Sequence, residues 1–354
     1  MRVTFVLPGA GDLPVGGFKV VYEYANRLTR RGHTVGVVHT AQPDRAAGLT
    51  TRLKKGVRFV QRGLDKSYRP GWFALHPDVR VSWCLTPSAG AVPDGDAVVA
   101  TSWETAEWAA RYPASKGRGL YLIQHYETWS GTAARVDATF TAGLRNVAIA
   151  RWLQEVVRER GADAAYVPNG LDLGAFGPDT PLEGRGPHAM MLYHHADWKG
   201  SADGLEALHV VKAELPELTA TLFGTPAAPA DLPGWIHYEQ KPPPARLRRL
   251  YNEAAVFLAT SWTEGWGLPG CEALLCGCAL AATDVGGHRE YALPGETALL
   301  SPPKDPQAMA DNVLELLRNA PLRYRLAEQG RAYVRRFTWE RAVAGLEAEL
   351  IGDA

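Results

Sequence analysis

Short, mainly apolar runs alternate with amphipathic helical segments along this chain, and this alternation restricts the possible folds more than any other feature. In the first half the apolar runs are Val3–Leu7, Val35–His39, Ala97–Ala100, Leu120–Gln124 and Val147–Ala150. Strands without polar alternation are buried on both faces, which is typical of a parallel sheet covered by helices. Helical patterns such as Phe18–Arg31 and Trp152–Arg160 supply that cover. The pattern therefore predicts an α/β domain with a doubly wound sheet.

The same pattern restarts after a segment rich in chain-breaking residues. Gly174–Pro187 contains four glycines and three prolines and is predicted to be an interdomain linker. Beyond it lie further strand runs and helical patterns, namely Met190–His194, Ala202–Leu215, Ala220–Phe223, Ile236–Tyr238, Ala245–Asn252 and Val256–Ala259. A length of 354 residues suits two such domains. Residues 41–90 are less regular and are expected to form strands and loops.

Composition and charge narrow the class of protein. The formal net charge is zero, so a nucleic-acid partner is not expected. Residues 1–180 hold 22 Lys and Arg against 16 Asp and Glu, a modest positive excess that suits an anionic acceptor or a peripheral contact with a membrane surface. The first residues lack the features of a signal peptide, and no apolar stretch approaches the ~18 residues of a membrane span.

The four cysteines bear on metal binding and on cellular location. Three of them, Cys271, Cys276 and Cys278, lie within eight residues, which does not suit a disulfide framework. They also lack a second pair at zinc-site spacing, so we predict packed apolar side chains and no metal site. A cytoplasmic location is expected.

The stretch Thr263–Glu272 carries the clearest chemical signal. It follows a predicted strand and opens a helix, and its glycines let the backbone turn sharply and approach a ligand closely. The N–H groups at the start of a helix favour a diphosphate. Glu264 lies in the loop, within reach of a sugar, whereas Glu272 lies about one turn into the helix, where its carboxylate can accept a hydrogen bond from a ribose hydroxyl. A plain strand–turn–helix with a glutamate near the helix N-terminus is the alternative interpretation of these residues alone.

In its wider context this stretch resembles the signature of glycosyltransferase family four, a large group of retaining enzymes with the two-domain GT-B fold. The matching segments are Glu264–Pro269, Glu272-Ala273, Cys276-Gly277, Val285–Gly287 with Glu290, Pro168–Asp172 with Phe176, Leu247–Ala254 and Phe337–Trp339. They cover most of the chain in the family's order. The resemblance implies a first domain over 1–178, a donor domain over 187–337 facing it across a cleft, and a C-terminal helix over 338–354 crossing back onto the first domain.

The resemblance also implies roles for residues of the second domain. Glu264 would contact hydroxyls of the donor sugar, Glu272 the ribose, and the backbone at Gly267 and Leu268 the phosphates, with Gly265 and Trp266 in the same turn. Lys199 would neutralise the departing diphosphate, which needs electrostatic stabilisation. His194 stands where the family usually has an arginine; histidine is a weaker and pH-dependent partner for phosphate, and whether it replaces that arginine is open.

In the first domain the resemblance singles out two further sites. Gly16-Gly17 lies between the first strand and a helix, where the family has glycines beside the donor phosphates. His125 follows a strand at the edge of the sheet where doubly wound domains bind ligands, and would stand beside the reacting sugar. Glu127 and Trp129 would face the acceptor. His125, Glu264 and Lys199 are the expected catalytic residues.

These inferences lead to one expected function and two alternatives. We expect a retaining, metal-independent hexosyltransferase that needs no cofactor beyond its nucleotide-diphosphate sugar and acts on a glycan, lipid-linked or small-molecule acceptor. A GT-B epimerase or phosphorylase would be a different enzyme on the same fold. A non-catalytic GT-B subunit would bind a partner; the missing arginine favours it slightly, whereas Glu264, Lys199 and Glu272 argue against it. The donor sugar, its base, the acceptor, the linkage and the oligomeric state do not follow from the sequence.

Overall fold

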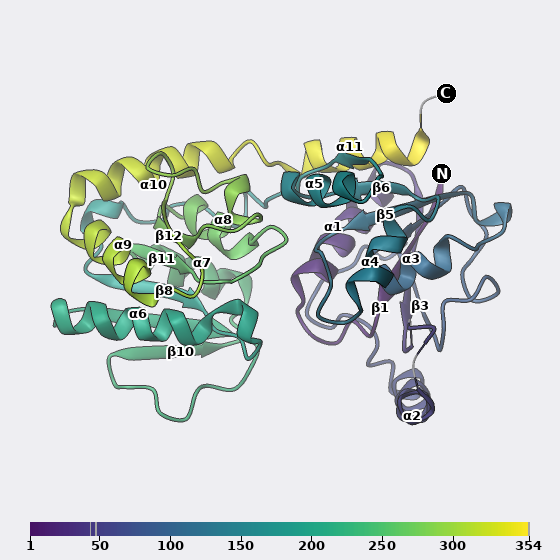
Figure 1. Ribbon diagram of the computed structural model, residues 1–354, viewed down its shortest axis with the longest axis horizontal. Helices are drawn as coiled ribbons and strands as arrows, with labels where there is room; N and C mark the ends of the chain where they lie inside the picture. Colours follow the sequence, from purple (N-terminus) through teal and green to yellow (C-terminus); the bar gives the residue numbers. More distant parts are fainter. Residues whose placement is uncertain (43, 47, 353–354) are drawn as a thin grey trace. The chain divides into compact units, whose positions relative to one another are not determined.

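The computed structural model describes residues 1–42, 44–46 and 48–352, and the chain divides into two compact units. The first unit comprises Met1–Gly170 together with Glu340–Ala354, and the second comprises Leu171–Trp339. Each unit is a parallel sheet with helices on its faces (Figure 1). The predicted doubly wound α/β architecture is confirmed.

The first unit contains a seven-stranded sheet in the order β3-β2-β1-β4-β5-β6-β7. Its strands are β1 (Arg2–Pro8), β2 (Thr34–Thr40), β3 (Arg80–Cys84), β4 (Ala97–Ala100), β5 (Arg118–Ile123), β6 (Arg145–Ala148) and β7 (Ala164–Tyr166). Its helices are α1 (Gly16–Arg30), α2 (Leu49–Asp65), α3 (Trp103–Ala109), α4 (Ala133–Phe140), α5 (Arg151–Glu159) and α11 (Trp339–Ile351), which begins at the last residue of the second unit. β1 and β4 lie next to each other in the middle of the sheet. From β1 the chain adds strands toward one edge, and from β4 it adds strands toward the other edge, so the order reverses between these two strands. Ligands of doubly wound sheets bind at the carboxyl ends of the strands near such a reversal.

The second unit contains a six-stranded sheet in the order β10-β9-β8-β11-β12-β13, built by the same rule. Its strands are β8 (His188–Leu192), β9 (Thr219–Gly224), β10 (Ile236–Gln240), β11 (Val256–Ala259), β12 (Ala279–Thr283) and β13 (Leu299–Ser301). Its helices are α6 (Ser201–Glu214), α7 (Pro244–Glu253), α8 (Leu268–Leu275), α9 (Pro306–Arg318) and α10 (Ala320–Val334). β8 and β11 meet at its reversal point, so the same reasoning places a ligand site beside the loops that follow them.

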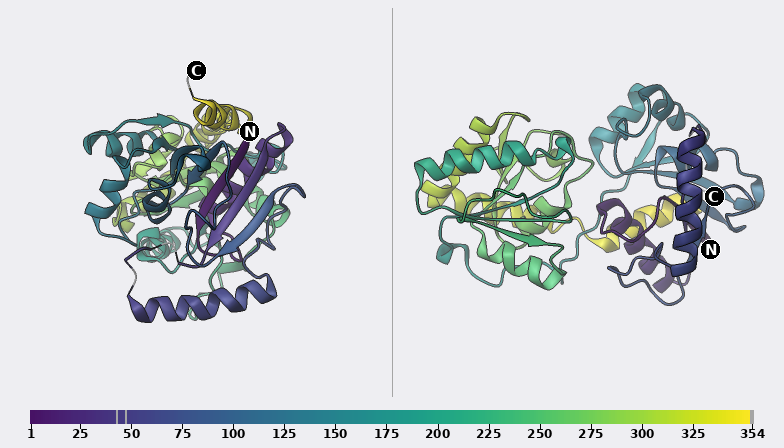
Figure 2. Two further views of the ribbon diagram at one scale, coloured as in Figure 1. Left: turned by 90° about the vertical axis from the view of Figure 1, so that its right-hand side faces the viewer. Right: turned by 90° about the horizontal axis from the view of Figure 1, so that it is seen from below.

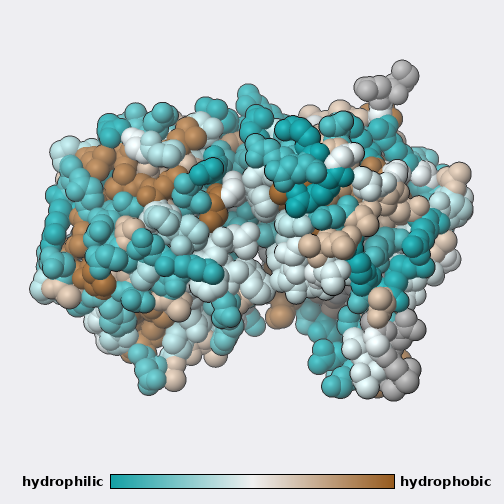
Figure 3. Space-filling view, viewed as in Figure 1, coloured by the Kyte–Doolittle hydropathy of each residue, from teal (hydrophilic) through white to brown (hydrophobic). Residues whose placement is uncertain are grey.

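Burial follows the apolar runs that predicted the strands. β4 and β12 are buried along their whole length, and the sheet side chains pack against the inward faces of the helices. On the face drawn in Figure 3, apolar surface gathers mainly over the second unit, where α9 and α10 lie. No helix in the described part of the chain is long and apolar enough to cross a membrane.

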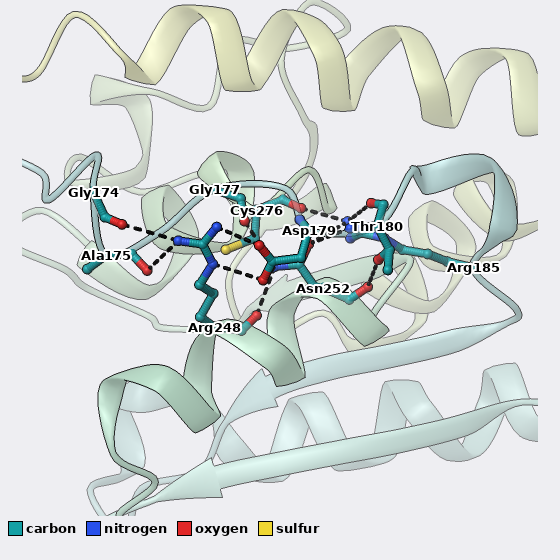
Figure 4. Close-up of polar contacts among 9 residues, drawn as sticks. All are labelled: Gly174, Ala175, Gly177, Asp179, Thr180, Arg185, Arg248, Asn252 and Cys276. Carbon is teal, nitrogen blue, oxygen red and sulfur yellow. Dashed lines mark hydrogen bonds and ion pairs between the residues drawn. The ribbon is translucent and has the colours of Figure 1, made fainter.

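The segment that was predicted to be a linker is instead an integral part of the second unit. The boundary lies between Gly170 and Leu171, before the glycine- and proline-rich stretch 174–187. Figure 4 shows how this stretch is held: Arg248 forms an ion pair with Asp179 and donates to the carbonyls of Gly174 and Ala175. The prediction was wrong because glycine and proline break regular structure without preventing side-chain anchoring.

Arg185 provides the second anchor of this stretch, and it is buried. Its guanidinium donates to the carbonyl oxygens of Tyr251 and Ala254 at the end of α7 over 3.1 and 2.8 Å. It also donates to the carbonyl oxygen of Cys276 at the end of α8 over 2.7 Å (Figure 4). A cation is favourable at a helix C-terminus, where carbonyl groups lack intrahelical partners. One side chain therefore links the C-terminal ends of two helices to the stretch.

Residues 41–90 differ from expectation as well. They contain the helix α2 in addition to β3, whereas strands and loops were expected. Gly56 and Gly63 lower the helix propensity of this segment, and three of its apolar side chains are exposed, so its pattern does not resemble a helix packed on a core. Figure 2 shows α2, in dark blue, along the margin of the first unit.

Candidate functional site

A small pocket of about 50 Å³ lies in the second unit, beside the loops after β8 and β11 and the start of α8. Its lining residues are Leu192, Lys199, Phe257, Leu258, Ala259, Thr260, Ser261, Glu264, Gly267, Pro269, Gly270 and His288. Three residues that the sequence singled out are therefore brought together here: Lys199, Glu264 and Gly267. They stand at the reversal point of the sheet, where a doubly wound domain binds its ligand.

The turn into α8 depends on glycine at the position before the helix. Gly267 has a φ of +91°, in the left-handed region that side chains disfavour. A Cβ atom there would stand 2.5 Å from the hydroxyl oxygen of Tyr291, which itself donates a 2.8 Å hydrogen bond to the Gly267 carbonyl. This close packing fixes the start of α8, whose first N–H groups have no intrahelical partners.

A lysine and a glutamate that lie 65 residues apart form an ion pair in the pocket. The Lys199 ammonium lies 2.7 Å from Oε2 of Glu264, and the Ser261 hydroxyl donates to the same oxygen over 3.0 Å. Both charged side chains are largely buried, with 23% and 16% of their surface exposed. Thr260 donates to the Lys199 carbonyl and so ties the two loops together. The carboxylate has a fixed orientation, and the cation beside it is screened little by water.

Glu272 lies on α8, on the buried side of the helix. The hydroxyl of the fully buried Tyr251 donates to Oε2 of Glu272 over 3.3 Å. Burial raises the pKa of Tyr251 well above its usual range, and the negative charge of Glu272 raises it further. Tyr251 therefore remains a neutral donor that orients the glutamate. Glu272 is not part of the pocket lining and stands one helical turn further on.

His194 follows β8 in a loop, outside the lining of the pocket. Its Nδ1 accepts a hydrogen bond from the N–H of Ala196 over 2.9 Å. Burial lowers the pKa of His194, and the positive charges of Lys199 and His195 lower it further, against the opposing effect of Glu264. The imidazole is thus disfavoured as a cation at neutral pH, which makes it a poor electrostatic substitute for arginine.

Other residues that were predicted for the donor site do not line the pocket. The Trp266 side chain is buried and packs edge-to-face on Phe337, with ring centroids 5.0 Å apart, so it does not line the pocket. The residues on either side of the turn, Gly265 and Leu268, are not among the lining residues either. The sequence indicates this turn as a unit, but which of its side chains point into the pocket depends on three-dimensional packing.

His288 lines the pocket and was not predicted as a site residue. Its Nδ1 lies 2.9 Å from the Thr283 carbonyl oxygen, which can only accept, so Nδ1 carries the proton. Burial lowers the pKa of this histidine. A neutral ring with its proton on Nδ1 leaves Nε2 as an acceptor. The adjacent Val285–Gly287 motif was the available signal, because it places the histidine directly after a strand and a glycine pair.

In the first unit, Gly17 lies close to the strand end that bears His125. Gly16 and Gly17 open α1, and a Cβ atom at Gly17 would stand 3.3 Å from the Gln124 side-chain amide. Only a residue without a side chain allows this approach without displacing Gln124. The loop after β1 and the loop after β5 are thus in contact at the carboxyl edge of the sheet.

His125 itself lies among aromatic rings. Its ring contacts Trp129 edge-to-face at a centroid distance of 4.5 Å and lies 5.6 Å from the ring of Trp152. Trp129 is 46% exposed, so this large apolar side chain faces solvent next to the histidine. An exposed indole beside a polar group is a suitable surface for the face of a sugar ring.

Glu127 points back into the first unit. Its Oε2 accepts a 2.9 Å hydrogen bond from the N–H of Trp103, the first residue of α3. Burial raises the pKa of Glu127 to about 8, and the charge of Glu104 acts in the same direction, against the Trp103 hydrogen bond. The carboxyl is therefore mostly protonated at pH 7, and its role as an acceptor-facing residue stays a prediction.

The cysteines of the site region are free thiols. Cys271, Cys276 and Cys278 are buried in the second unit, and burial raises the pKa of Cys276 to about 12. Within the described ranges, no three histidine, cysteine, aspartate or glutamate side chains gather in a way that could hold a metal ion.

The chain has two Rossmann-like units. At the reversal point of the second sheet lie a glycine turn, an acidic side chain and a lysine. Together these features define the GT-B class of fold. Solved structures agree: the chain matches Anabaena HepE in complex with UDP and glucose with a TM-score of 0.74, 16% identity and 99% coverage of both chains. It matches sucrose-phosphate synthase from Thermosynechococcus elongatus with a TM-score of 0.73, 16% identity and 98% coverage of both.

Sequence relatives identify the family. Residues 191–333 match the model of glycosyl transferases group 1. The chain is 31% identical to D-inositol 3-phosphate glycosyltransferase of Xylanimonas cellulosilytica, over 96% of this chain and 92% of the relative. It is 27% identical to phosphatidyl-myo-inositol mannosyltransferase of Mycobacterium tuberculosis, over 96% and 93%. The chain belongs to the group 1 glycosyltransferases.

Proposed function

We propose that this glycosyltransferase moves a hexose from a nucleotide-diphosphate donor to a glycan, lipid-linked or small-molecule acceptor, with retention of anomeric configuration. The observation that carries the proposal is the Lys199–Glu264 pair at the start of α8. A helix N-terminus and an ammonium group together favour a diphosphate, and a fixed carboxylate beside them suits the hydroxyls of the attached sugar.

Each residue has a distinct part in the proposed reaction. The start of α8 and Lys199 stabilise the charge that develops on the diphosphate as the bond to the sugar breaks. Glu264 accepts hydrogen bonds from the donor sugar and holds it in position. The acceptor oxygen attacks from the face that the diphosphate leaves, and the departing diphosphate takes the acceptor's proton. In this scheme His125, which belongs to the first unit, does not serve as the base.

The named relatives support a nucleotide sugar as donor and an acceptor that carries a phosphate. HepE was solved with UDP and glucose, and the relatives are named for D-inositol 3-phosphate and phosphatidyl-myo-inositol. The proposed transfer is independent of metal ions and cofactors, because the backbone N–H groups at the start of α8 and the Lys199 ammonium would supply the positive charge that a diphosphate requires. The proposed location is the cytoplasm, at the inner face of the membrane when the acceptor is a lipid.

The first prediction tests the nucleotide site at Glu272. Substitution Glu272→Gln removes the charge that would accept the ribose hydroxyls while keeping the size of the side chain. Loss of one charge-assisted hydrogen bond should weaken nucleotide-diphosphate binding by about 1.5–3 kcal/mol. The measurement is titration calorimetry with UDP, GDP and ADP, with Glu328→Gln on the exposed face of α10 as the surface control. An unchanged dissociation constant in Glu272→Gln would remove the assignment.

A further inference from the structure

His288 is almost completely buried, with 2% of its surface exposed, and yet it lines the pocket at the start of α8. It is the first residue of the short 3₁₀ helix His288–Glu290, which follows β12. Its ring packs edge-to-face on Tyr291, and a Cβ atom at Gly267 would stand only 2.9 Å from its Cδ2. The missing side chain at Gly267 therefore lets the imidazole approach the turn into α8 closely.

The Nδ1 side of this imidazole is held by a single threonine. Nδ1 lies 2.9 Å from the Thr283 carbonyl oxygen and 3.2 Å from the Thr283 hydroxyl oxygen. The carbonyl can only accept, and the hydroxyl donates its own hydrogen to the Ser261 carbonyl oxygen over 2.5 Å. Both oxygens therefore accept from Nδ1, which carries the proton of the ring.

The Nε2 side of the ring is left as an acceptor. Within the described part of the chain, no residue forms a hydrogen bond with Nε2 of His288. This nitrogen is also not among the unpartnered polar atoms of the described residues that are sealed from solvent, so its lone pair is reachable from the pocket. Burial lowers the pKa of His288, against the raising effect of Glu264, which keeps the ring neutral at pH 7.

The size of the pocket limits what can reach this nitrogen. Its volume is about 50 Å³, whereas a water molecule requires roughly 10–15 Å³. The pocket therefore admits a few groups of the size of a hydroxyl, which suits one edge of a sugar and does not suit an acyl group or a nucleobase. The carboxylate of Glu264 lines the same pocket, so two acceptors, Glu264 and His288, face its interior.

We propose that Nε2 of His288 accepts a hydrogen bond from a hydroxyl group of the donor sugar and makes this histidine a specificity residue of the transfer. The inference rests on the proposed function and deepens it by naming what the site requires of the sugar. A hydroxyl can donate to Nε2, whereas an ionised phosphate or carboxylate oxygen cannot. A site that bonds a hydroxyl discriminates strongly against an analogue without it, because the buried acceptor is left unpaired.

The experiment compares the affinity for a nucleotide sugar with that for its nucleotide diphosphate, on the full chain, by titration calorimetry. The probes are UDP-glucose, ADP-glucose and GDP-mannose beside UDP, ADP and GDP. His288→Phe keeps an aromatic ring against Tyr291 but removes the acceptor. It should weaken binding of the nucleotide sugar about tenfold and change binding of the nucleotide diphosphate less than twofold. Equal losses for both ligands would show a structural role or a contact with the ribose, and would overturn the proposal.

Two further variants separate this role from a general loss of structure. His288→Asn keeps an amide that can donate to the Thr283 carbonyl, but its shorter side chain lacks the atoms that reach the pocket, so it should show the same selective loss. Thr283→Val is the matched control, because it removes the hydroxyl beside Nδ1 and leaves Nε2 in place. It should change both affinities by the same factor. A selective loss in Thr283→Val with none in His288→Asn overturns the proposal.

Monodeoxy analogues of the donor that binds, each lacking the hydroxyl at C2, C3, C4 or C6, locate the contact. The loss of affinity caused by one of these deletions in the wild type should disappear in His288→Phe, because the acceptor for that hydroxyl is gone. Losses that stay the same at every carbon would overturn the proposal. Failure of the wild type to bind any of the nucleotide diphosphates would instead overturn the proposed function, so the two failures are distinguishable.

Discussion

Substitution Lys199→Ala should lower turnover by at least a hundredfold while the protein remains folded. The Lys199 ammonium group lines the pocket at the start of α8 and lies 2.7 Å from Glu264. Removing one preorganised group that stabilises a developing negative charge typically costs a factor of 10²–10³ in rate. The measurement is the initial rate of sugar release from the nucleotide donor, with circular dichroism as the check on folding.

A variant of Glu264, the ion-pair partner of Lys199, distinguishes an electrostatic role of Lys199 from a merely structural one. Glu264→Gln breaks the same ion pair but keeps the lysine and removes a negative charge near the expected phosphates. Nucleotide-diphosphate affinity should therefore fall in Lys199→Ala and stay equal or rise in Glu264→Gln. If both variants lose affinity to the same extent, the pair only maintains the shape of the loops, and the role assigned to Lys199 is wrong.

The second large effect is expected on stability. Arg185→Met should lower the free energy of unfolding of the second unit by about 3 kcal/mol, because it removes a charged donor from several buried carbonyl groups. Those of Tyr251, Ala254 and Cys276 all accept from this guanidinium at helix ends. Methionine preserves most of the volume, so the loss reports hydrogen bonding and charge rather than a cavity. Urea unfolding followed by tryptophan fluorescence measures it.

Arg248 supplies the matched control within the same network (Figure 4). Its ion pair with Asp179 is half-exposed, with 29% and 45% of the side chains accessible. Pairs of this kind contribute about 0–1 kcal/mol. Arg248→Ala should therefore be close to neutral. Equal stability of the two variants would show that the buried guanidinium does not hold the stretch in place.

The fold was largely predictable because it depends on local sequence patterns. Apolar runs without alternation indicated the buried parallel strands, and β11 begins and ends at the residues expected for it. The glycine turn into α8 was equally visible, since only glycine suits the backbone conformation of Gly267. Both features require information from no more than about a dozen neighbouring residues.

The features that the sequence did not predict depend on contacts between residues far apart in the chain. Arg185 lies in a stretch whose composition suggests a loose linker, and its partners at the ends of α7 and α8 are 66 to 91 residues away. The raised pKa of Glu127, to about 8, arises from burial beside α3, which its own neighbours in sequence do not reveal. The helix α2 was missed because Gly56 and Gly63 lower its helix propensity and because apolar side chains that would mark a packed face are exposed on it.

The most direct test of the account is the anomeric configuration of the product, followed by proton NMR in excess EDTA. The protein is incubated with α-linked UDP- and GDP-hexoses and with a phosphorylated polyol as acceptor. A group 1 enzyme that uses Lys199 and the start of α8 in place of a metal ion should form an α-linked product from one of these donors. A β-linked product would contradict retention. Activity that EDTA abolishes and manganese restores would contradict the electrostatic role assigned to this site.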